Sequence, residues 1–150
     1  MKRLQWILPF VLLFAGISMA AQDNTPVRFT VRQEQTSENE ISVIFEAEIA
    51  EGWHVYSTDM PDGGPISASI TVESAKGASE AGGLVSEGKE ISAYDNMFGM
   101  DVRYFEKNVT FIQKFKVKGK RCRIKGFLEY AACNDTMCIP PATVEFSVEL

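Results

Sequence analysis

The chain has 150 residues, of which 45% are hydrophobic and 23% are charged, and its formal net charge is −5. This length suits one domain of ordinary size, and the composition excludes intrinsic disorder. An acidic balance also argues against nucleic acid as the main partner, because phosphate binding needs a basic surface. The three cysteines are too few for a disulfide-stapled miniprotein, so their spacing has to carry the interpretation.

The beginning of the chain has the three-part pattern of a secretory signal peptide. Two basic residues, Lys2 and Arg3, precede an almost wholly apolar run over residues 4–17, and small residues follow up to Ala20. We expect cleavage after Ala20, which leaves residues 21–150 as one soluble domain in an oxidising compartment. An uncleaved membrane anchor is the less favoured alternative, because the apolar run is shorter than the ~20 residues that span a bilayer.

Beyond residue 20, apolar and polar residues alternate with the period of two that is typical of half-buried strands. The alternation predicts six strands, at residues 27–31, 41–49, 66–72, 109–117, 122–130 and 144–148. A short aromatic segment at 53–56 and loops at 59–65 and 76–83 separate some of them. No stretch has sustained helical periodicity. The sequence therefore predicts six to eight strands in two packed antiparallel sheets, a β-sandwich or a small barrel.

Seven of the fifteen basic residues lie in one run, Lys114 to Lys125. Because the run follows strand periodicity, we interpret it as the solvated face of a hairpin, with an anion site as the alternative.

The cysteine pair is the main candidate for chemistry. Cys133 and Cys138 enclose four residues, and Pro140 and Pro141 follow, which cannot donate to a ladder. A tight loop between strands can bring two Cα atoms within the ~4.4–6.8 Å that a disulfide requires. A loop of this length stabilises a fold by only roughly 2 kcal/mol. Spacing alone leaves a redox pair and a local staple both open, and Cys122 is predicted to be a buried, inert thiol.

The same residues argue against a metal centre. Two thiolates and the only histidine, His54, leave a tetrahedral zinc site short of ligands. We therefore predict no metal and no cofactor, and we interpret His54 as a hydrogen-bonded structural residue. Copper(I) stays open as an alternative, because soft thioethers are available as further ligands: Met60, Met97, Met100 and Met137.

Three segments resemble one known family. The stretch from Tyr130 to Pro141 (YAACNDTMCIPP) resembles the active-site segment of the N-terminal periplasmic domain of the thiol:disulfide interchange protein DsbD. Residues 52–56 (GWHVY) and 94–99 (YDNMFG) support the resemblance, which covers nearly the whole mature chain. The sequence is most similar to stand-alone versions from Bacteroides-type bacteria.

The resemblance implies an immunoglobulin-like β-sandwich in the periplasm that acts as a thiol–disulfide oxidoreductase. Cys138 matches the cysteine that forms mixed disulfides with partners, and Cys133 matches the resolving cysteine. The implied partners are a membrane DsbD-like electron donor and periplasmic thioredoxin-like or disulfide isomerase proteins. Since the chain ends at Leu150, we expect this donor to be a separate protein.

The resemblance also implies a protective cap over the cysteine pair. Its residues are Asp95, Asn96, Met97, Phe98 and Gly99, with either Phe98 or Met97 as the shielding side chain. Trp53 and Tyr56 are expected to line the same end of the domain. Asp135, within the cysteine loop, and Asp95 are expected to disfavour a thiolate by charge repulsion.

One departure and one rival interpretation follow. Four residues separate these cysteines, where the best-known members of the family have five, so the loop geometry is expected to differ. The rival is a non-enzymatic immunoglobulin-like binding module, in which the small disulfide only rigidifies a recognition loop.

Overall fold

The computed structural model describes residues 25–150, so the predicted signal peptide lies outside the described residues. Twelve strands and no helix form in this part of the chain, and hence no helix here could cross a membrane. The strands are β1 (Val27–Ser37), β2 (Glu40–Ile49), β3 (His54–Tyr56), β4 (Ser69–Lys76), β5 (Ala78–Glu80), β6 (Val85–Glu87), β7 (Ile91–Asp95), β8 (Met100–Phe105), β9 (Asn108–Val117), β10 (Arg123–Tyr130), β11 (Ala132–Cys133) and β12 (Ala142–Glu149).

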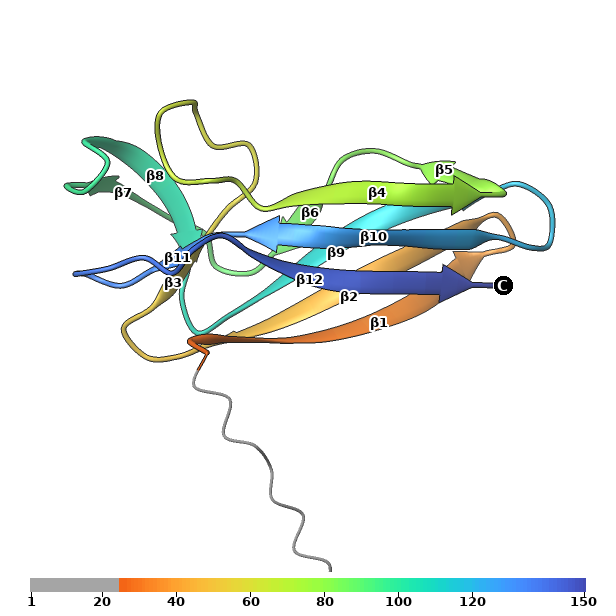
Figure 1. Cartoon of the computed structure of the whole chain (residues 1–150), viewed down its shortest axis with the longest axis horizontal. Helices are drawn as coiled ribbons and strands as arrows, with labels where there is room; N and C mark the ends of the chain where they lie inside the picture. The colour runs from red at the N-terminus through yellow and green to blue at the C-terminus, as the bar shows by residue number, and fades with distance from the viewer. Residues whose placement is uncertain (1–24) are drawn as a thin grey trace, which may run out of the picture.

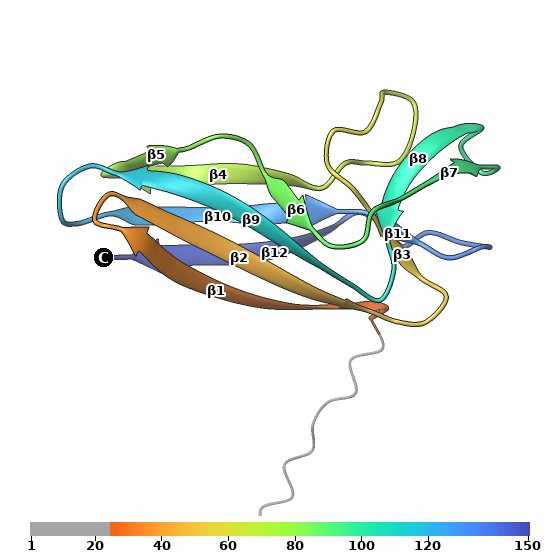
Figure 2. The same cartoon turned by 180° about the vertical axis from the view of Figure 1, so that it is seen from behind.

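Two antiparallel sheets pack face to face and form the body of the molecule. One sheet has the order β1-β2-β9-β5, with β6 also paired to β9, and the other has the order β12-β10-β4. The second sheet lies in front in Figure 1, and the first lies in front when the molecule is seen from behind in Figure 2. The prediction of an all-β fold with two packed antiparallel sheets is confirmed.

The apolar phases of the alternating strands face each other between these sheets. Phe146 of β12 packs with Phe45 of β2 at a ring-centroid distance of 5.7 Å and with Phe115 of β9 at 6.0 Å. A side chain at Gly126 in β10 would collide with the carbonyl oxygen of Thr71 and crowd the Phe146 ring. Glycine at this position therefore leaves room for the β4 backbone and the Phe146 ring of β12 to pack against β10.

The opposite phase of β9 and β10 carries the basic run. Lys114 and Lys116 are exposed, whereas their neighbours Phe115 and Val117 are buried. The solvated positions of this run are confirmed, but the expected hairpin is wrong, because β9 and β10 belong to opposite sheets and do not pair. Each of these strands presents one face to the core and the other to water.

A third sheet, β11-β3-β8-β7, lies at the end of the sandwich away from the C-terminus (Figure 1). It is built from continuations of the main strands, since β3 follows β2, β11 follows β10 and β8 leads into β9. Short strands account for most of the excess over the predicted six to eight. They include β5, which lies within the segment predicted as a loop at 76–83 and pairs with β9. This small sheet holds the cysteine pair.

Candidate active site

Cys133 and Cys138 form a disulfide across a tight antiparallel turn. The Asn134 N–H donates to the Met137 carbonyl at 2.8 Å, and the Ile139 N–H donates to the Ala132 carbonyl at 3.0 Å. The two cysteines therefore occupy a non-hydrogen-bonded pair, the position where facing side chains come closest, and their Cα atoms are 3.9 Å apart. The backbone of this turn brings the two sulfurs together.

The side chain of Asn134 closes the turn between the cysteines. Asn134 Oδ1 accepts hydrogen bonds from the backbone N–H groups of Thr136 at 2.9 Å and Met137 at 2.7 Å. Asparagine favours such turns because its side chain can replace a backbone acceptor. Pro140 and Pro141 follow trans peptide bonds, and the chain then enters β12.

The two sulfur-bearing residues differ in exposure. Cys133 is 1% exposed and packs with Tyr56, Val102 and Ala131 in a small cluster separate from the main core. Cys138 lies at the edge of that cluster and is only partly buried. An incoming group therefore reaches the sulfur of Cys138 before that of Cys133.

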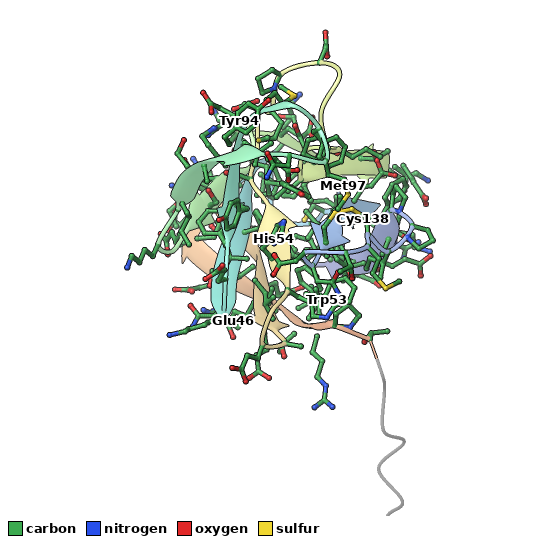
Figure 3. All side chains as sticks on the ribbon, turned by 90° about the vertical axis from the view of Figure 1, so that its left-hand side faces the viewer. Glu46, Trp53, His54, Tyr94, Met97 and Cys138 are labelled. Atoms are coloured by element: carbon green, nitrogen blue, oxygen red, sulfur yellow. A yellow bond between two sulfur atoms is a disulfide. The ribbon has the colours of Figure 1, made fainter. Side chains whose placement is uncertain are left out.

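The hairpin turn between β7 and β8 covers Cys138. Asp95 organises this turn, because its Oδ1 accepts from the N–H groups of Met97 at 2.7 Å and Phe98 at 3.2 Å. The Gly99 N–H donates to the Asp95 carbonyl at 2.7 Å, and Gly99 has a φ of 66°, a conformation that favours glycine. The turn places the Met97 sulfur 3.8 Å from the Cys138 sulfur. Figure 3 shows the two residues next to each other at this end of the molecule.

The residues expected in the cap have distinct positions. Met97 is the one that contacts the Cys138 sulfur, and its side chain is 51% exposed. Phe98 turns inward, packs against the Cys133 cluster and meets the Tyr56 ring edge-on at 6.1 Å between centroids. Asn96 is exposed at the tip of the turn. Phe98 thus supports the turn from below, while Met97 lies over the disulfide.

Tyr56 joins the cap turn to the strand beside Cys133. Its hydroxyl donates to Asp95 Oδ2 at 3.1 Å and lies 3.0 Å from His54 Nε2. A tyrosine hydroxyl has only one proton to donate, so the second hydrogen bond has to come from a protonated His54 Nε2. The hydrogen bonds therefore run in one direction, from His54 through Tyr56 to Asp95. They fix the histidine tautomer that carries its proton on Nε2.

Burial keeps two side chains of this hydrogen-bond chain, His54 and Tyr56, uncharged. Desolvation lowers the pKa of His54, and the nearby Asp95, Glu106 and Asp135 offset part of that effect. Burial and the Asp95 carboxylate raise the pKa of Tyr56 well above its ordinary value. His54 is thus a hydrogen-bonded residue, as the sequence predicts, and it pairs in register with Cys133 across β3 and β11.

Two residues of this end were not singled out from the sequence. Tyr104 meets the His54 ring in a tilted arrangement at 4.5 Å between centroids, and Val102 packs in the cysteine cluster. Both belong to β8, which the alternation did not predict. The resemblance at residues 94–99 could have indicated them, because it marks the turn that immediately precedes this strand.

Arg103 anchors the long loop between β3 and β4 beside the site. Its guanidinium donates to the carbonyls of Thr58 at 2.7 Å and Asp59 at 2.8 Å, and it pairs with Glu90 at 3.4 Å. The loop carries Met60 against the cysteine cluster. One side of the site is therefore closed by a loop that β8 holds in place.

A cavity of about 440 Å³ opens between the cap turn and the cysteine loop. It is lined in part by His54, Tyr104, Asp95 and Asp135, of which Asp135 is exposed. Trp53 lies apart from this group, because its side chain packs against the main core (Figure 3). The structure thus brings the predicted cap residues, Tyr56 and Asp135 together around the disulfide and leaves Trp53 below them.

The remaining cysteine is remote from this chemistry. Cys122 is unpaired, 5% exposed and part of the main core, and burial raises the pKa of its thiol. The prediction of a buried thiol is confirmed. Among the described residues, no group of three or more His, Cys, Asp or Glu side chains is arranged to hold a metal ion.

Residues 20–150 match the family described as "Thiol:disulfide interchange protein DsbD, N-terminal". The chain belongs to this DsbD N-terminal domain family. Members of the family carry out thiol–disulfide exchange, and the chain has the disulfide that such exchange requires. Comparison with curated protein sequences found no significant match.

Comparison with solved structures found a similar fold in one domain and weaker likenesses in others. The N-terminal periplasmic domain of ScsB from Proteus mirabilis is 18% identical, with a TM-score of 0.59 over 86% of this chain. This chain spans 47% of that one, about half its length. The reduced DsbD N-terminal domain of Neisseria meningitidis is 20% identical, with a TM-score of 0.45 over 80% of this chain and 83% of its own. The complex of the DsbD and PilB N-terminal domains from the same species gives 17% identity, coverages of 85% and 88%, and a TM-score of 0.40.

Proposed function

We propose that this domain relays reducing equivalents between a membrane electron donor and periplasmic thiol proteins through Cys133 and Cys138. The observation that carries the proposal is the position of the disulfide. It lies at the end of the sandwich, with its outer sulfur partly buried beneath a single thioether and its inner sulfur fully buried. Membership of the DsbD N-terminal family supports the same chemistry.

Reduction of the domain begins at Cys138. A thiolate of the donor attacks the Cys138 sulfur, the disulfide breaks, and Cys133 leaves as a thiolate that takes up a proton. A second donor thiol then attacks the donor's own sulfur in the mixed disulfide. The donor becomes a disulfide, and the domain receives two electrons and two protons as a dithiol.

Delivery reverses these steps with a different partner. The Cys138 thiolate attacks a disulfide of the acceptor and forms a mixed disulfide, and Cys133 then attacks Cys138 and releases the reduced acceptor. Burial suits Cys133 to this resolving role, because it can reach its neighbour in the turn but not an outside protein. Cys138 is the cysteine that meets partners in both directions.

A structural role for this disulfide is less well supported. The bond closes a loop of sequence separation five, for which the chain-entropy estimate is only roughly 2 kcal/mol. The flanking backbone hydrogen bonds and the Asn134 side chain already close the same turn. A staple would therefore add little at this position, whereas a relay needs the pair to lie at a reachable end of the domain.

The cap makes the disulfide exchange selective for partner proteins over small reagents. Met97 lies over the Cys138 sulfur, so a partner that displaces the cap turn reacts faster than a small reagent. In the reduced domain, Asp95 and Asp135 add negative charge around the pair and disfavour a free thiolate until a partner is bound. The reduced dithiol is thereby protected from adventitious oxidation.

The proposal includes the location and the partners. We place the mature domain, residues 21–150, in the periplasm after cleavage of the signal peptide near Ala20. The proposed donor is a membrane DsbD-like protein, and the proposed acceptors are thioredoxin-like or disulfide isomerase proteins. The stand-alone, Bacteroides-type form of the domain stays a prediction.

The reduction potential of the Cys133–Cys138 pair separates this proposal from the binding-module alternative. Equilibration with glutathione or dithiothreitol buffers, followed by thiol alkylation and mass measurement, gives the potential. A relay predicts a value between about −120 and −270 mV, the range of exchange proteins. A value below about −300 mV would identify a structural bond and favour the binding module.

A further inference from the structure

Methionines from separate segments lie around the cluster that contains the cysteine pair. The Met97 sulfur of the cap turn lies 3.8 Å from the Cys138 sulfur. Met60, from the loop between β3 and β4, and Met100, from β8, pack against the same cluster as Cys133. The relay chemistry uses only the two cysteines, so it leaves these thioethers without a chemical role.

Thiolate and thioether sulfurs are soft donors, and together they favour copper(I) over harder divalent ions. With metal–sulfur bonds of about 2.3 Å, three sulfurs in a trigonal plane lie about 4 Å apart. The observed separation of 3.8 Å between the Met97 and Cys138 sulfurs already fits one edge of such a triangle. The Cys133 sulfur, which is bonded to Cys138 in the disulfide, has to move to about the same separation from the Cys138 sulfur once the bond is reduced.

We propose that the reduced domain binds one copper(I) ion through the Cys133 and Cys138 thiolates and the Met97 thioether. Reduction of the disulfide consumes two electrons and two protons and gives two thiols. Copper(I) then displaces the thiol protons, and its own oxidation state does not change. The inference rests on the proposed function in one respect, that the disulfide can be reduced.

Copper(I) binding would also oppose the relay. Both cysteine sulfurs are held by the metal, so Cys138 cannot attack an acceptor and Cys133 cannot resolve a mixed disulfide. The site therefore gives the domain two exclusive states, a free dithiol that exchanges and a metal complex that does not.

The test uses the mature chain, reduced with a phosphine and desalted under nitrogen. Thiols are first counted in denaturant before and after reduction. Copper(I) is then supplied as its acetonitrile complex, in competition with a coloured copper(I) chelator, and X-ray absorption counts the sulfur ligands. We expect two new thiols on reduction, one bound copper per chain and three sulfur ligands.

Two methionine variants make the test specific. Met97→Leu keeps an apolar side chain over Cys138 and should lower the sulfur count to two, with affinity reduced at least about tenfold. Met137→Leu tests the other thioether of the cysteine loop as an alternative ligand, and it should leave the sulfur count at three because Met137 is 54% exposed and belongs to neither side of the sulfur contact. The double variant Cys133→Ser/Cys138→Ser retains Cys122 and should lose the copper bound at this affinity.

The outcomes distinguish failure of the proposed relay from failure of the copper site. If no new thiols form on reduction, the proposed relay fails together with the site. If the thiols form but copper binds with two sulfurs in the wild type, or equally well in Met97→Leu, the copper inference is overturned and the relay is untouched. A sulfur count of three that falls to two only in Met97→Leu supports the site.

Discussion

The sulfur of Met97 lies 3.8 Å from the sulfur of Cys138, although 41 residues separate the two in the chain. Cys138 has no S–H in the disulfide, so this contact is one of polarisable sulfur atoms and not a hydrogen bond. The Asp95 carboxylate maintains it by fixing the turn that carries Met97. Access to the reactive sulfur therefore depends on hydrogen bonds within a hairpin turn.

Truncation of the cap side chain should open the disulfide to small reagents. In Met97→Ala we expect reduction by dithiothreitol to be faster by about threefold to tenfold, because the group that covers Cys138 is removed. Stopped-flow or quenched thiol counting measures the rate. Met137→Ala is the control, since Met137 is exposed in the neighbouring loop. Equal rates in the wild type and Met97→Ala would remove Met97 as the shield.

The Tyr56 hydroxyl should contribute to stability. Tyr56→Phe removes a hydrogen bond to the Asp95 carboxylate and the acceptor of the His54 N–H, so the free energy of unfolding should fall by about 1–3 kcal/mol. Urea denaturation of the oxidised protein measures this change. Tyr94→Phe, at a side chain that is 63% exposed, should change it little. A Tyr56→Phe protein as stable as Tyr94→Phe would contradict the hydrogen-bond chain.

His54 should titrate below its ordinary range. Burial lowers its folded-state pKa from 6.5, so the unfolded chain binds a proton more readily, and stability should fall as the pH drops from about 7 through 6.5 and below. Because His54 is the only histidine, one NMR signal reports its pKa directly. His54→Gln should lose this part of the pH dependence. A folded pKa at or above 6.5 would show that the three nearby carboxylates outweigh burial.

The two carboxylates near the pair should raise the pKa of the reduced thiols. Asp135→Asn and Asp95→Asn each remove a negative charge, so the thiol pKa should fall in both variants. Thiolate absorbance against pH gives the pKa. Glu38→Gln, in the turn between β1 and β2, is the distant control. An unchanged thiol pKa in both aspartate variants would show that neither carboxylate disfavours the thiolate.

The body of the sandwich was predictable because its strands bury one face. The segments of β9 and β12 alternate in burial, since every second side chain packs between two sheets. In the end sheet, β8 alternates over only a few residues, and β7 breaks the rule. The inner positions of β7 hold Ile91, Ala93 and Asp95, while Tyr94 points outward and is 63% exposed. Hydrophobic periodicity is a weak guide to a short strand in which an aromatic ring faces water and an acid faces inward.

The site was predictable in its residues but not in its connections. Cysteine spacing and the family resemblance together pointed to the pair and the cap segment. The link from Tyr56 to Asp95 depends on the pairing of β3 with β8 and of β8 with β7, which is set by register over long sequence distances. The choice between Met97 and Phe98 as the residue over the disulfide depends on that turn geometry. Trp53 shares the aromatic segment with Tyr56 but packs into the main core.

Trapping of the mixed disulfide tests the relay most directly. Cys133→Ala leaves Cys138 without its resolving partner, so after reduction, desalting and incubation with the oxidised, disulfide forms of periplasmic thiol proteins it should accumulate disulfide-linked adducts on a non-reducing gel. Mass spectrometry should place the link at Cys138, and Cys138→Ala should yield far fewer adducts because Cys133 is buried. A Cys133→Ala protein that forms no adducts, or one that forms no more than Cys138→Ala, would contradict the relay.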